Sequence, residues 1–469
     1  MKTVIVVAML VLQSISAFGQ DNRRENWWEK MNGCRMYYLQ FGENTFKKIE
    51  ADLDNLYDKG YRIISFYCIH DGDRRAYAGL GPYDYYSAQR TAGSLADFES
   101  LSSAVHAKGM KMLTWMNLGY SNPEHSYWQK AERDKRDEID SQQARSFIWS
   151  DTKMEPGDRL WGWGYSETAE CWYKKSWGYP GFNWAEPAWQ NEAKRILDFW
   201  MDRGIDGFVV DAAEFYEEYN GASKAILKQY IGDTVSGRNC IAVPEGSTPT
   251  PEWSSERNFS HSYDNDDDTA SHDRTNMAWD AIDTHDPNVI ENHLKESGDG
   301  ARALGGGTFS YDPETRHRRD HAKRPLEVAI MTSVGVLYEL WFSCQRGYGE
   351  YTDEIENVLR AVNSTPALEL GGSRARLPND QSTVYSIMKR SVDGTRCALC
   401  VFNLGESSVE VTVSLSGSGI RSGQYPKDLL TGENGIHISS EDYVLALPAF
   451  GFALYEVDID AALTVDRQR

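Results

Sequence analysis

The feature that most constrains this chain is an alternation of short, apolar, β-rich runs with amphipathic helical patterns. The first helical pattern carries Phe46, Ile49, Leu53 and Leu56 on one face, and Gly60 ends it. Such an alternation is typical of repeated βα units and a parallel sheet. Eight strands are predicted in this way, at residues 35–41, 61–69, 110–118, 207–211, 241–243, 259–263, 308–311 and 336–340.

Eight strands that alternate with helices predict a (β/α)₈ TIM barrel over residues 20–120 and 181–365. Between residues 121 and 180 the periodicity fails and Trp, Gly and Tyr crowd together, so we expect an irregular inserted domain after the third strand. Residues 366–458 show strand patterns with turn residues and no helix, which predicts a C-terminal antiparallel β-sandwich domain. Residues 459–469 are expected to form a loose tail.

The first 19 residues have the pattern of a cleavable signal peptide. Lys2 is a short basic start, residues 4–12 form an apolar run too short to span a bilayer, and residues 17–19 are a small-x-small cleavage signature. We therefore expect cleavage near Gly19, a secreted or periplasmic protein, and no membrane insertion.

The charge balance excludes one large class of partner. Lys and Arg number 49 against 70 Asp and Glu, and the resulting net charge of −21 repels phosphate backbones, so nucleic acid is not expected as a partner. The chain has 15 Trp and 26 Tyr, and flat rings beside carboxylates suit sugar rings. Seven cysteines, an odd number spread over the chain, predict buried thiols and no dense disulfide framework.

Three of the predicted barrel strands are followed directly by an acid: Asp211, Glu245 and Asp312. The carboxyl ends of barrel strands meet on one face, so these side chains are expected to converge. Two carboxyl groups roughly 5 to 5.5 Å apart support a retaining glycosidase, in which one is the nucleophile and the other the general acid and base. Each acid alone could equally cap a loop or pair with a neighbouring base, but the three together favour catalysis.

Several further segments resemble glycoside hydrolase family 13, the α-amylase family, over most of the chain. The segment 179–184 (YPGFNW) is similar to a short motif of the oligo-1,6-glucosidase branch. Others are 108–113 (KGMKML), 148–151 (IWSD), 206–212 (DGFVVDA), 365–368 (TPAL), 428–432 (DLLTG) and 447–451 (LPAFG). The resemblance implies that Asp211 is the nucleophile, Glu245 the acid and base, and Asp312 the carboxylate that fixes a ring hydroxyl of an α-linked glycan.

The chain also departs from the family's pattern. Gly119 stands where the family usually has a calcium-ligating Asn, so we expect no metal, and no cofactor is indicated. Val209 replaces an Arg two residues before the nucleophile, and Gly81 replaces an Asp that grips a terminal glucose. We therefore expect a divergent member with a rebuilt first sugar subsite. The acidic run 264–268 lacks the pattern of a calcium loop and is interpreted as a solvated loop.

Candidate substrate-binding residues lie beside these positions. Tyr120 and Tyr311 are either ring platforms and phenol donors or packing residues of the barrel mouth, and Trp115 is either a ligand contact or a core residue. A basic stretch, 316–324, begins with Arg316 and His317 and follows Asp312. It is either a solvated helix face or a pocket for sulfate or carboxylate.

The sequence thus predicts a retaining α-glycosidase with an oligo- or polysaccharide substrate and a glycosyl-Asp211 intermediate. A transglycosylase would use the same residues and differ only in the acceptor. The alternative from another class is a catalytically degraded glycan-binding pseudoenzyme, which the lost subsite residues favour and the three retained acids oppose. The sequence predicts neither the sugar and its linkage nor the oligomeric state.

Overall fold

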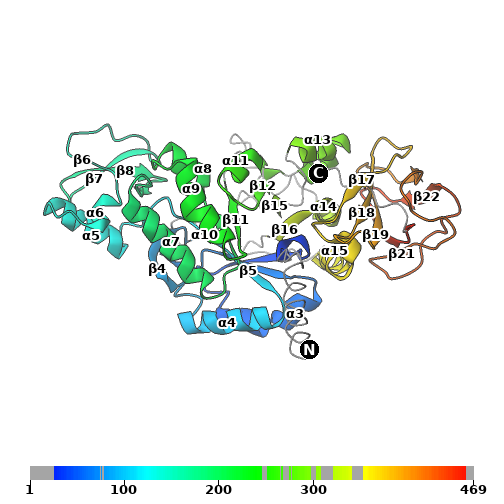
Figure 1. The fold of residues 1–469 in the computed structure, drawn as a ribbon, viewed down its shortest axis with the longest axis horizontal. Coiled ribbons are helices and arrows are strands. Elements are labelled where there is room, and N and C mark those ends of the chain that lie inside the picture. Colours follow the sequence, from blue (N-terminus) through cyan, green and yellow to red (C-terminus); the bar gives the residue numbers. More distant parts are fainter. Residues whose placement is uncertain are drawn as a thin grey trace, which may run out of the picture.

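The computed structural model shows three parts arranged along the long axis (Figure 1). A parallel sheet surrounded by helices lies in the middle, a small domain containing β6–β8 lies at one end, and an antiparallel β domain lies at the other. The predicted signal peptide lies outside the described residues. The residues that the structure describes are 26–73, 75, 79–245, 251–264, 266–267, 274–275, 277–296, 303–307, 321–340 and 352–460.

The central sheet has eight strands in the order β11-β10-β5-β2-β1-β16-β15-β12, and every hydrogen-bonded pair in it is parallel. Ser260, just before β12, donates its backbone N–H to the carbonyl of Ala242 in β11 at 3.0 Å, which joins the two ends of this order. The sheet is therefore a closed (β/α)₈ barrel, and the predicted fold class is confirmed. The strands are β1 (Cys34–Tyr38), β2 (Ile63–Tyr67), β5 (Lys111–Met116), β10 (Gly207–Val210), β11 (Ile241–Pro244), β12 (Ser262–Asp264), β15 (Ala303–Gly307) and β16 (Val336–Leu340).

The barrel strands are apolar runs because both of their faces are buried. In β10 all four residues are buried, and successive side chains alternate between the two faces of the sheet. Val209 points inward with Leu113 and Val243 into a cluster that fills the barrel, whereas Phe208 and Val210 join the larger core under the helices. Side chains thus fill the inside of the barrel, and a functional site has space only at the rim.

Helices cover the outside of the barrel. Ser94 and Asp97 form a reciprocal capping box at the start of α4, and Pro187 occupies the first turn of α7 as predicted. The helical pattern at 46–56 forms two helices that meet at Asp52. The longer helices are α2 (Phe46–Ala51), α3 (Leu53–Asp58), α4 (Leu95–Ala107), α7 (Pro187–Met201), α8 (Ala213–Glu218), α11 (Pro251–Glu256), α12 (Met277–Thr284), α13 (Asn288–Glu296), α14 (Arg324–Val334) and α15 (Thr352–Ser364).

The seventh barrel strand begins earlier than predicted. The sequence pattern predicts it at residues 308–311, but the structure forms β15 at Ala303–Gly307. This segment, ALGGG, has no β-branched residue and little strand propensity of its own. Its parallel pairing with β16 on one side and β12 on the other specifies it instead. The predicted segment 308–311 and Asp312 lie outside the described residues, as do all residues from 308 to 320.

The inserted domain after β5 is more ordered than the sequence suggests. Its strands are antiparallel, and β8 is the central one, paired with β6, β7 and β9. Trp128 stacks on Trp149 with ring centroids 5.1 Å apart, so the crowded aromatic residues form a small core. The elements are α5 (Ser126–Arg136), α6 (Gln142–Arg145), β6 (Trp149–Ser150), β7 (Gly162–Ser166), β8 (Cys171–Ser176) and β9 (Tyr179–Pro180).

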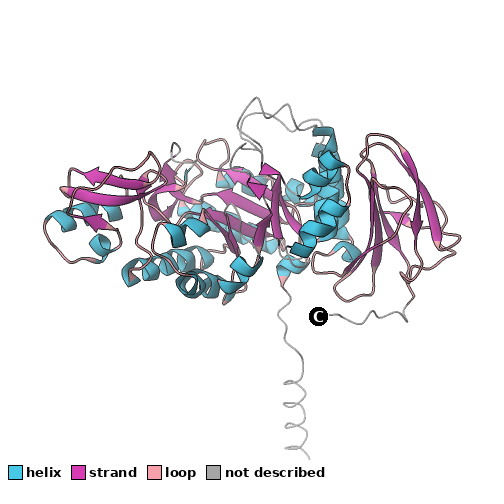
Figure 2. Ribbon diagram, turned by 90° about the horizontal axis from the view of Figure 1, so that it is seen from above, coloured by secondary structure: helices cyan, strands magenta, loops and turns pink. Residues whose placement is uncertain are grey.

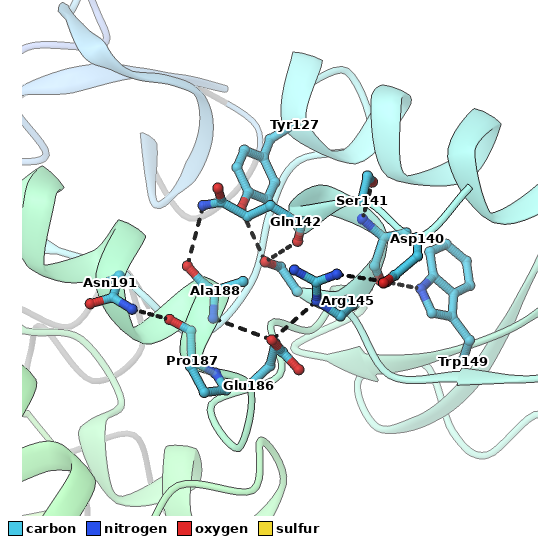
Figure 3. Close-up of polar contacts among 12 residues, drawn as sticks. Tyr127, Asp140, Ser141, Gln142, Arg145, Trp149, Glu186, Pro187, Ala188 and Asn191 are labelled. Carbon is cyan, nitrogen blue, oxygen red and sulfur yellow. Dashed lines mark hydrogen bonds and ion pairs between the residues drawn. The ribbon is translucent and has the colours of Figure 1, made fainter. Parts of the chain in front are cut away.

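The inserted domain is fastened to the first turn of α7, as Figure 3 shows. Gln142 donates its side-chain amide to the carbonyl of Ala188 at 3.4 Å, and Arg145 Nε donates to Glu186 Oε1 at 3.3 Å. Beneath these contacts the buried rings of Phe182 and Trp189 stack with centroids 3.3 Å apart. Apolar packing therefore attaches the domain to the barrel, and the polar contacts set its orientation.

The C-terminal domain consists of a five-stranded sheet, β17-β18-β19-β23-β21, and a separate pair, β20-β22, all antiparallel (Figure 2). Alternate side chains of β19 pack in opposite directions: Ala398, Cys400 and Phe402 join the barrel's outer core, and Leu399 and Val401 join the domain's own core. The central strands are therefore buried on both faces. The strands are β17 (Arg374–Arg376), β18 (Val384–Arg390), β19 (Cys397–Asn403), β20 (Val409–Ser414), β21 (Lys427–Asp428), β22 (Asp442–Leu447) and β23 (Phe452–Val457).

Two expectations from the sequence, on membrane-spanning helices and on the cysteines, can be compared with the described residues. Among them, no helix is long and apolar enough to cross a membrane. The six cysteines that the structure describes are free and buried, as expected for packing thiols: Cys34, Cys68, Cys171, Cys240, Cys397 and Cys400.

Candidate active site

Two of the three predicted carboxylates lie side by side at the rim of the barrel. Strands β10 and β11 pair in register, with Val210 opposite Pro244, so Asp211 and Glu245 both leave the sheet at its carboxyl edge. Glu245 continues the ladder by donating its N–H to the carbonyl of Val210 at 2.8 Å. The sequence prediction that these strand ends bring two acids together therefore has a geometric basis in the register of the sheet.

A backbone hydrogen bond connects the two positions directly. The N–H of Ala212, the residue after Asp211, donates to Glu245 Oε2 at 2.8 Å. Ala213 N–H also donates to the Glu245 carbonyl at 2.9 Å. The start of α8 thus holds both the backbone and the carboxylate of Glu245 next to Asp211.

The backbone on both sides of this site is in the left-handed region. Ala212 has a φ of 49° and Cys68, which follows β2, has a φ of 62°. Residues with a Cβ rarely adopt this conformation, and the energy it costs is often found at functional sites. At Ala212 this conformation accompanies the hydrogen bond to Glu245 Oε2.

Two phenols and one thiol interact electrostatically with Asp211. Burial raises the pKa of the Tyr67 phenol well above its usual value, and the charge of Asp211 raises this pKa further. Burial and then Asp211 also raise the pKa values of the Tyr216 phenol and the Cys68 thiol. These three groups therefore stay neutral at physiological pH, so they present hydrogen-bond donors, not negative charges, around the carboxylate.

Val209 occupies the position at which the α-amylase family usually has an arginine. Val209 lies two residues before Asp211, so both side chains project from the same face of β10, into the barrel. Val209 is fully buried among apolar residues. A cation at this position would lie directly below Asp211, so a valine here leaves the site without that charge.

Tyr120 and Trp115 are close to this rim and are almost completely buried. Tyr120 is 2% exposed, and its ring stacks on Tyr179 with centroids 5.2 Å apart. Trp115, in β5, is 1% exposed, and its ring centroid lies 5.3 Å from that of Tyr67. Both side chains are packed as structural residues are, and their contact with a sugar stays a prediction.

The remaining predicted site residues, Asp312, Tyr311, Arg316 and His317, lie outside the described residues. Residues 321–324, at the end of the basic stretch, are described. Arg324 is 2% exposed and donates to Glu327 Oε2 at 2.9 Å, and Lys323 lies 4.1 Å from the ring centroid of Phe450. Arg324 is therefore a core residue paired with a buried carboxylate, and at this residue the stretch is neither a solvated helix face nor a ligand pocket.

The sequence reasoning missed a group of half-buried aromatic residues beside the carboxylates. Trp161 of the inserted domain stacks on Tyr219, immediately after α8, with centroids 4.0 Å apart, and lies 5.2 Å from Phe215. Phe215 and Tyr219 are four residues apart, which places them on one face of a helix that starts next to Asp211. This i, i+4 spacing was the signal that could have identified them.

The position of the family's calcium ligand is filled by a ring. A Cβ on Gly119 would lie 2.6 Å from Cε1 of Tyr216, so no larger side chain fits at position 119 unless Tyr216 moves. Within the described ranges, no group of three or more His, Cys, Asp or Glu residues is arranged to hold a metal ion. The residues present at this place therefore do not fit the family's calcium site, and metal independence stays a prediction.

A closed parallel barrel, an insertion after its third strand, two acids at neighbouring strand ends and a C-terminal β domain define the α-amylase type of TIM-barrel protein. The family model described as "Alpha amylase, catalytic domain" matches residues 76–256. An α-amylase from H. orenii has the same fold, with a TM-score of 0.68 at 16% identity over 92% of this chain and 100% of that one. Residues 76–256 are thus similar to the catalytic domain of the α-amylase family, and the rest of the chain shares the fold of solved α-amylases.

Similarity to curated relatives extends over part of their length. An oligo-1,6-glucosidase of Halalkalibacterium halodurans is 25% identical over 217 residues, which are 42% of this chain and 37% of that protein. The amino acid transporter heavy chain SLC3A1 of Homo sapiens is 27% identical over 258 residues, 50% of this chain and 36% of that protein. The matches thus cover less than half of either relative, and the two names describe different kinds of protein.

Proposed function

We propose that this protein is a retaining α-glycosidase that acts on an α-linked glycan. The observation that carries the proposal is the hydrogen bond from Ala212 N–H to Glu245 Oε2. It holds one carboxylate next to another at the rim of a barrel, which is the arrangement that double-displacement chemistry at a sugar requires. The match of residues 76–256 to the α-amylase catalytic domain supports the same reaction class.

In the first step, an Asp211 oxygen attacks the anomeric carbon while the bond from that carbon to the leaving oxygen breaks. Glu245 gives its proton to the leaving oxygen. In the second step, Glu245 takes a proton from water, the water oxygen attacks the same carbon, and the bond to Asp211 breaks. The configuration is inverted twice and is therefore retained.

The backbone donor at Glu245 determines which oxygen holds the proton. Oε2 accepts from Ala212 N–H, so it must offer a lone pair to that donor. A carbonyl oxygen is the better acceptor in a protonated carboxyl group, so we infer that Oε1 carries the transferable proton. The same N–H stabilises the carboxylate form that Glu245 adopts after protonating the leaving group.

Two further readings use the same geometry. A transglycosylase would differ only in accepting a sugar hydroxyl instead of water in the second step. A glycan-binding pseudoenzyme is favoured by the replacement of the family's arginine by Val209 and by similarity to a transporter heavy chain. The proximity of Asp211 and Glu245 argues for turnover, because binding alone does not require a paired nucleophile and acid.

Export through the predicted signal peptide, residues 1–19, is part of the proposal and rests on the sequence pattern. An exported protein of this family would meet oligo- or polysaccharides outside the cytoplasm. Residues 1–25 lie outside the described residues, so N-terminal sequencing of the protein purified from its own host tests the cleavage near Gly19.

A fluorinated α-glycosyl donor tests the proposed function directly. Such donors form the glycosyl-enzyme intermediate and release it slowly, so peptide mapping of the inactivated protein is expected to find the label on Asp211. Screening a panel of donors with different sugars identifies the substrate at the same time. A label on another residue, or slow hydrolysis of every donor without labelling, would contradict the mechanism.

A further inference from the structure

A surface pocket lies in the C-terminal domain, far from the carboxylates. It has a volume of about 330 Å³, within the range of roughly 300–1,000 Å³ that is common for small-molecule sites. It is formed by β21, the end of β23, the loop before β21 and the turn before β19. Figure 1 shows β21 at the end of the molecule opposite the inserted domain.

The pocket has a rigid floor. Gln424 donates its side-chain amide to the carbonyls of Arg421 and Asp458 at 2.7 and 2.9 Å, and its Oε1 accepts from Asp458 N–H at 2.7 Å. The Gln424 amide therefore fastens the loop to the end of β23. This part of the lining is held in place before a ligand arrives, which lowers the entropic cost of binding.

Charged groups around the floor are held in opposite pairs. Arg396 Nε donates to Glu456 Oε1 at 2.9 Å, and Arg421 Nε donates to Asp460 Oδ1 at 2.8 Å. Lys427 is exposed and has no ion-pair partner within the part of the chain that the structure describes. The pocket thus presents positioned donors and acceptors together, without a large excess of either charge.

An aromatic ring stands beside these groups. Tyr425 is 62% exposed, the most exposed of the large hydrophobic side chains in the described residues, and its ring centroid lies 4.7 Å from that of His437. Exposing a ring to water to this extent leaves its apolar surface unburied. A ring of this kind next to polar groups suits a ligand with one apolar face and a hydroxylated edge.

We propose that this pocket binds a neutral sugar unit of a glycan chain, as an auxiliary site separate from Asp211. The apolar face of the sugar ring would lie on Tyr425, and its hydroxyls would bond with Arg396, Lys427 and Glu456. A phosphate or sulfate is less suited because Glu456 and Asp460 offset the two arginines. An apolar ligand would leave the charged lining without partners.

Affinity electrophoresis through gels that contain amylopectin, dextran or galactomannan tests this site, with heparin gels as the anionic comparison. The unmodified protein should be retarded by at least one neutral polymer, and Tyr425→Ala should weaken that association about fivefold or more. Tyr57→Ala is the matched control, because Tyr57 is 39% exposed on α3 and far from the pocket. It should be retarded like the unmodified protein.

The same variants separate this proposal from the proposed glycosidase function. Tyr425→Ala should turn over a small soluble α-glycoside with unchanged kcat/KM, and Asp211→Asn should lose turnover but keep its retardation. Retardation that is equal with and without Tyr425, that occurs only on heparin, or that is absent from all neutral polymers overturns the auxiliary site. The unmodified protein could also show retardation that depends on Tyr425 but no turnover of any glycoside. This result would support the auxiliary site and contradict only the proposed glycosidase function.

Discussion

Ala212 donates its backbone N–H to Glu245 Oε2 at 2.8 Å, and so the residue that follows one candidate catalytic acid positions the other. This relationship guides the choice of variants. Glu245→Gln keeps a carbonyl oxygen that can accept from Ala212, whereas Glu245→Ala leaves the N–H without this acceptor. The glutamine variant therefore isolates the loss of the proton from the loss of structure.

Asp211→Asn and Glu245→Gln should each lower kcat by about a hundredfold or more, because general acid catalysis alone contributes roughly 10²–10⁴. The melting temperatures of both variants should stay close to that of the unmodified protein, since both replacements are nearly isosteric. Steady-state kinetics and calorimetry on the same preparations check this. Full activity in Asp211→Asn would end the assignment of the nucleophile.

Exhaustive chelation should change neither activity nor melting temperature. The reason is local: the Tyr216 ring fills the space in which a side chain at Gly119 would hold calcium. The measurement is a thermal melt and an activity assay before and after treatment with a chelator. A large decrease that calcium reverses would show that an ion is bound elsewhere in the chain.

Maltose, isomaltose and soluble starch should be poor substrates. A site that hydrogen-bonds sugar hydroxyls discriminates by roughly 10⁴–10⁵, so replacing its polar partners by groups such as Gly81 and Val209 should remove much of the preference for glucose. We further predict that an anionic α-glycan is cleaved faster, because of the basic residues at 316–319, with an advantage that falls as salt rises. Turnover of maltotriose with a kcat/KM of about 10⁴ M⁻¹s⁻¹ or more would contradict this prediction.

Lys389 should make folding stability depend on alkaline pH. Burial lowers its pKa from 10.5 to about 8, and its Nζ has no hydrogen-bond partner among the described residues. Between these two values the unfolded chain binds more protons, so the free energy of unfolding rises as pH increases from about 8 to 10.5.

The corresponding test replaces the lysine by an apolar residue. Lys389→Met should be more stable than the unmodified protein by about 3 kcal/mol at pH 7, and this difference should shrink to near zero above pH 10. Chemical denaturation across pH measures it, with the exposed Lys427→Met as control. A difference that does not vary with pH would mean that Lys389 stays protonated in the folded protein.

Phe182→Ala should destabilise the protein by about 3–5 kcal/mol, because the ring is fully buried and stacks on Trp189 between the inserted domain and α7. The exposed Tyr165→Ala, also in an aromatic position of the insert, should change stability by less than about 0.5 kcal/mol. Urea unfolding followed by tryptophan fluorescence compares the two. Equal effects would show that the insert does not depend on this stack.

The sequence by itself determined the barrel and the edge of the sheet at which two acids meet. Strands such as β2, β5 and β10 are recognisable because burial on both faces requires continuous apolar runs, and Pro187 marks the start of α7 because its ring fits only the first helical turn. Asp211 and Glu245 could be predicted together because parallel strands end on the same edge.

Only the tertiary structure decided where the seventh barrel strand forms, what fills the space beside Gly119 and whether Arg324 is buried. The glycine-rich strand β15 exists because its two neighbours pair with it, and Tyr216 fills the space beside Gly119 from a different element. Arg324 ends a basic run that looks solvated, yet it pairs with Glu327 in the core. Contacts of this kind join residues far apart in the chain or buried against other elements, so local periodicity and spacing, which report burial and chain direction, carry no record of them.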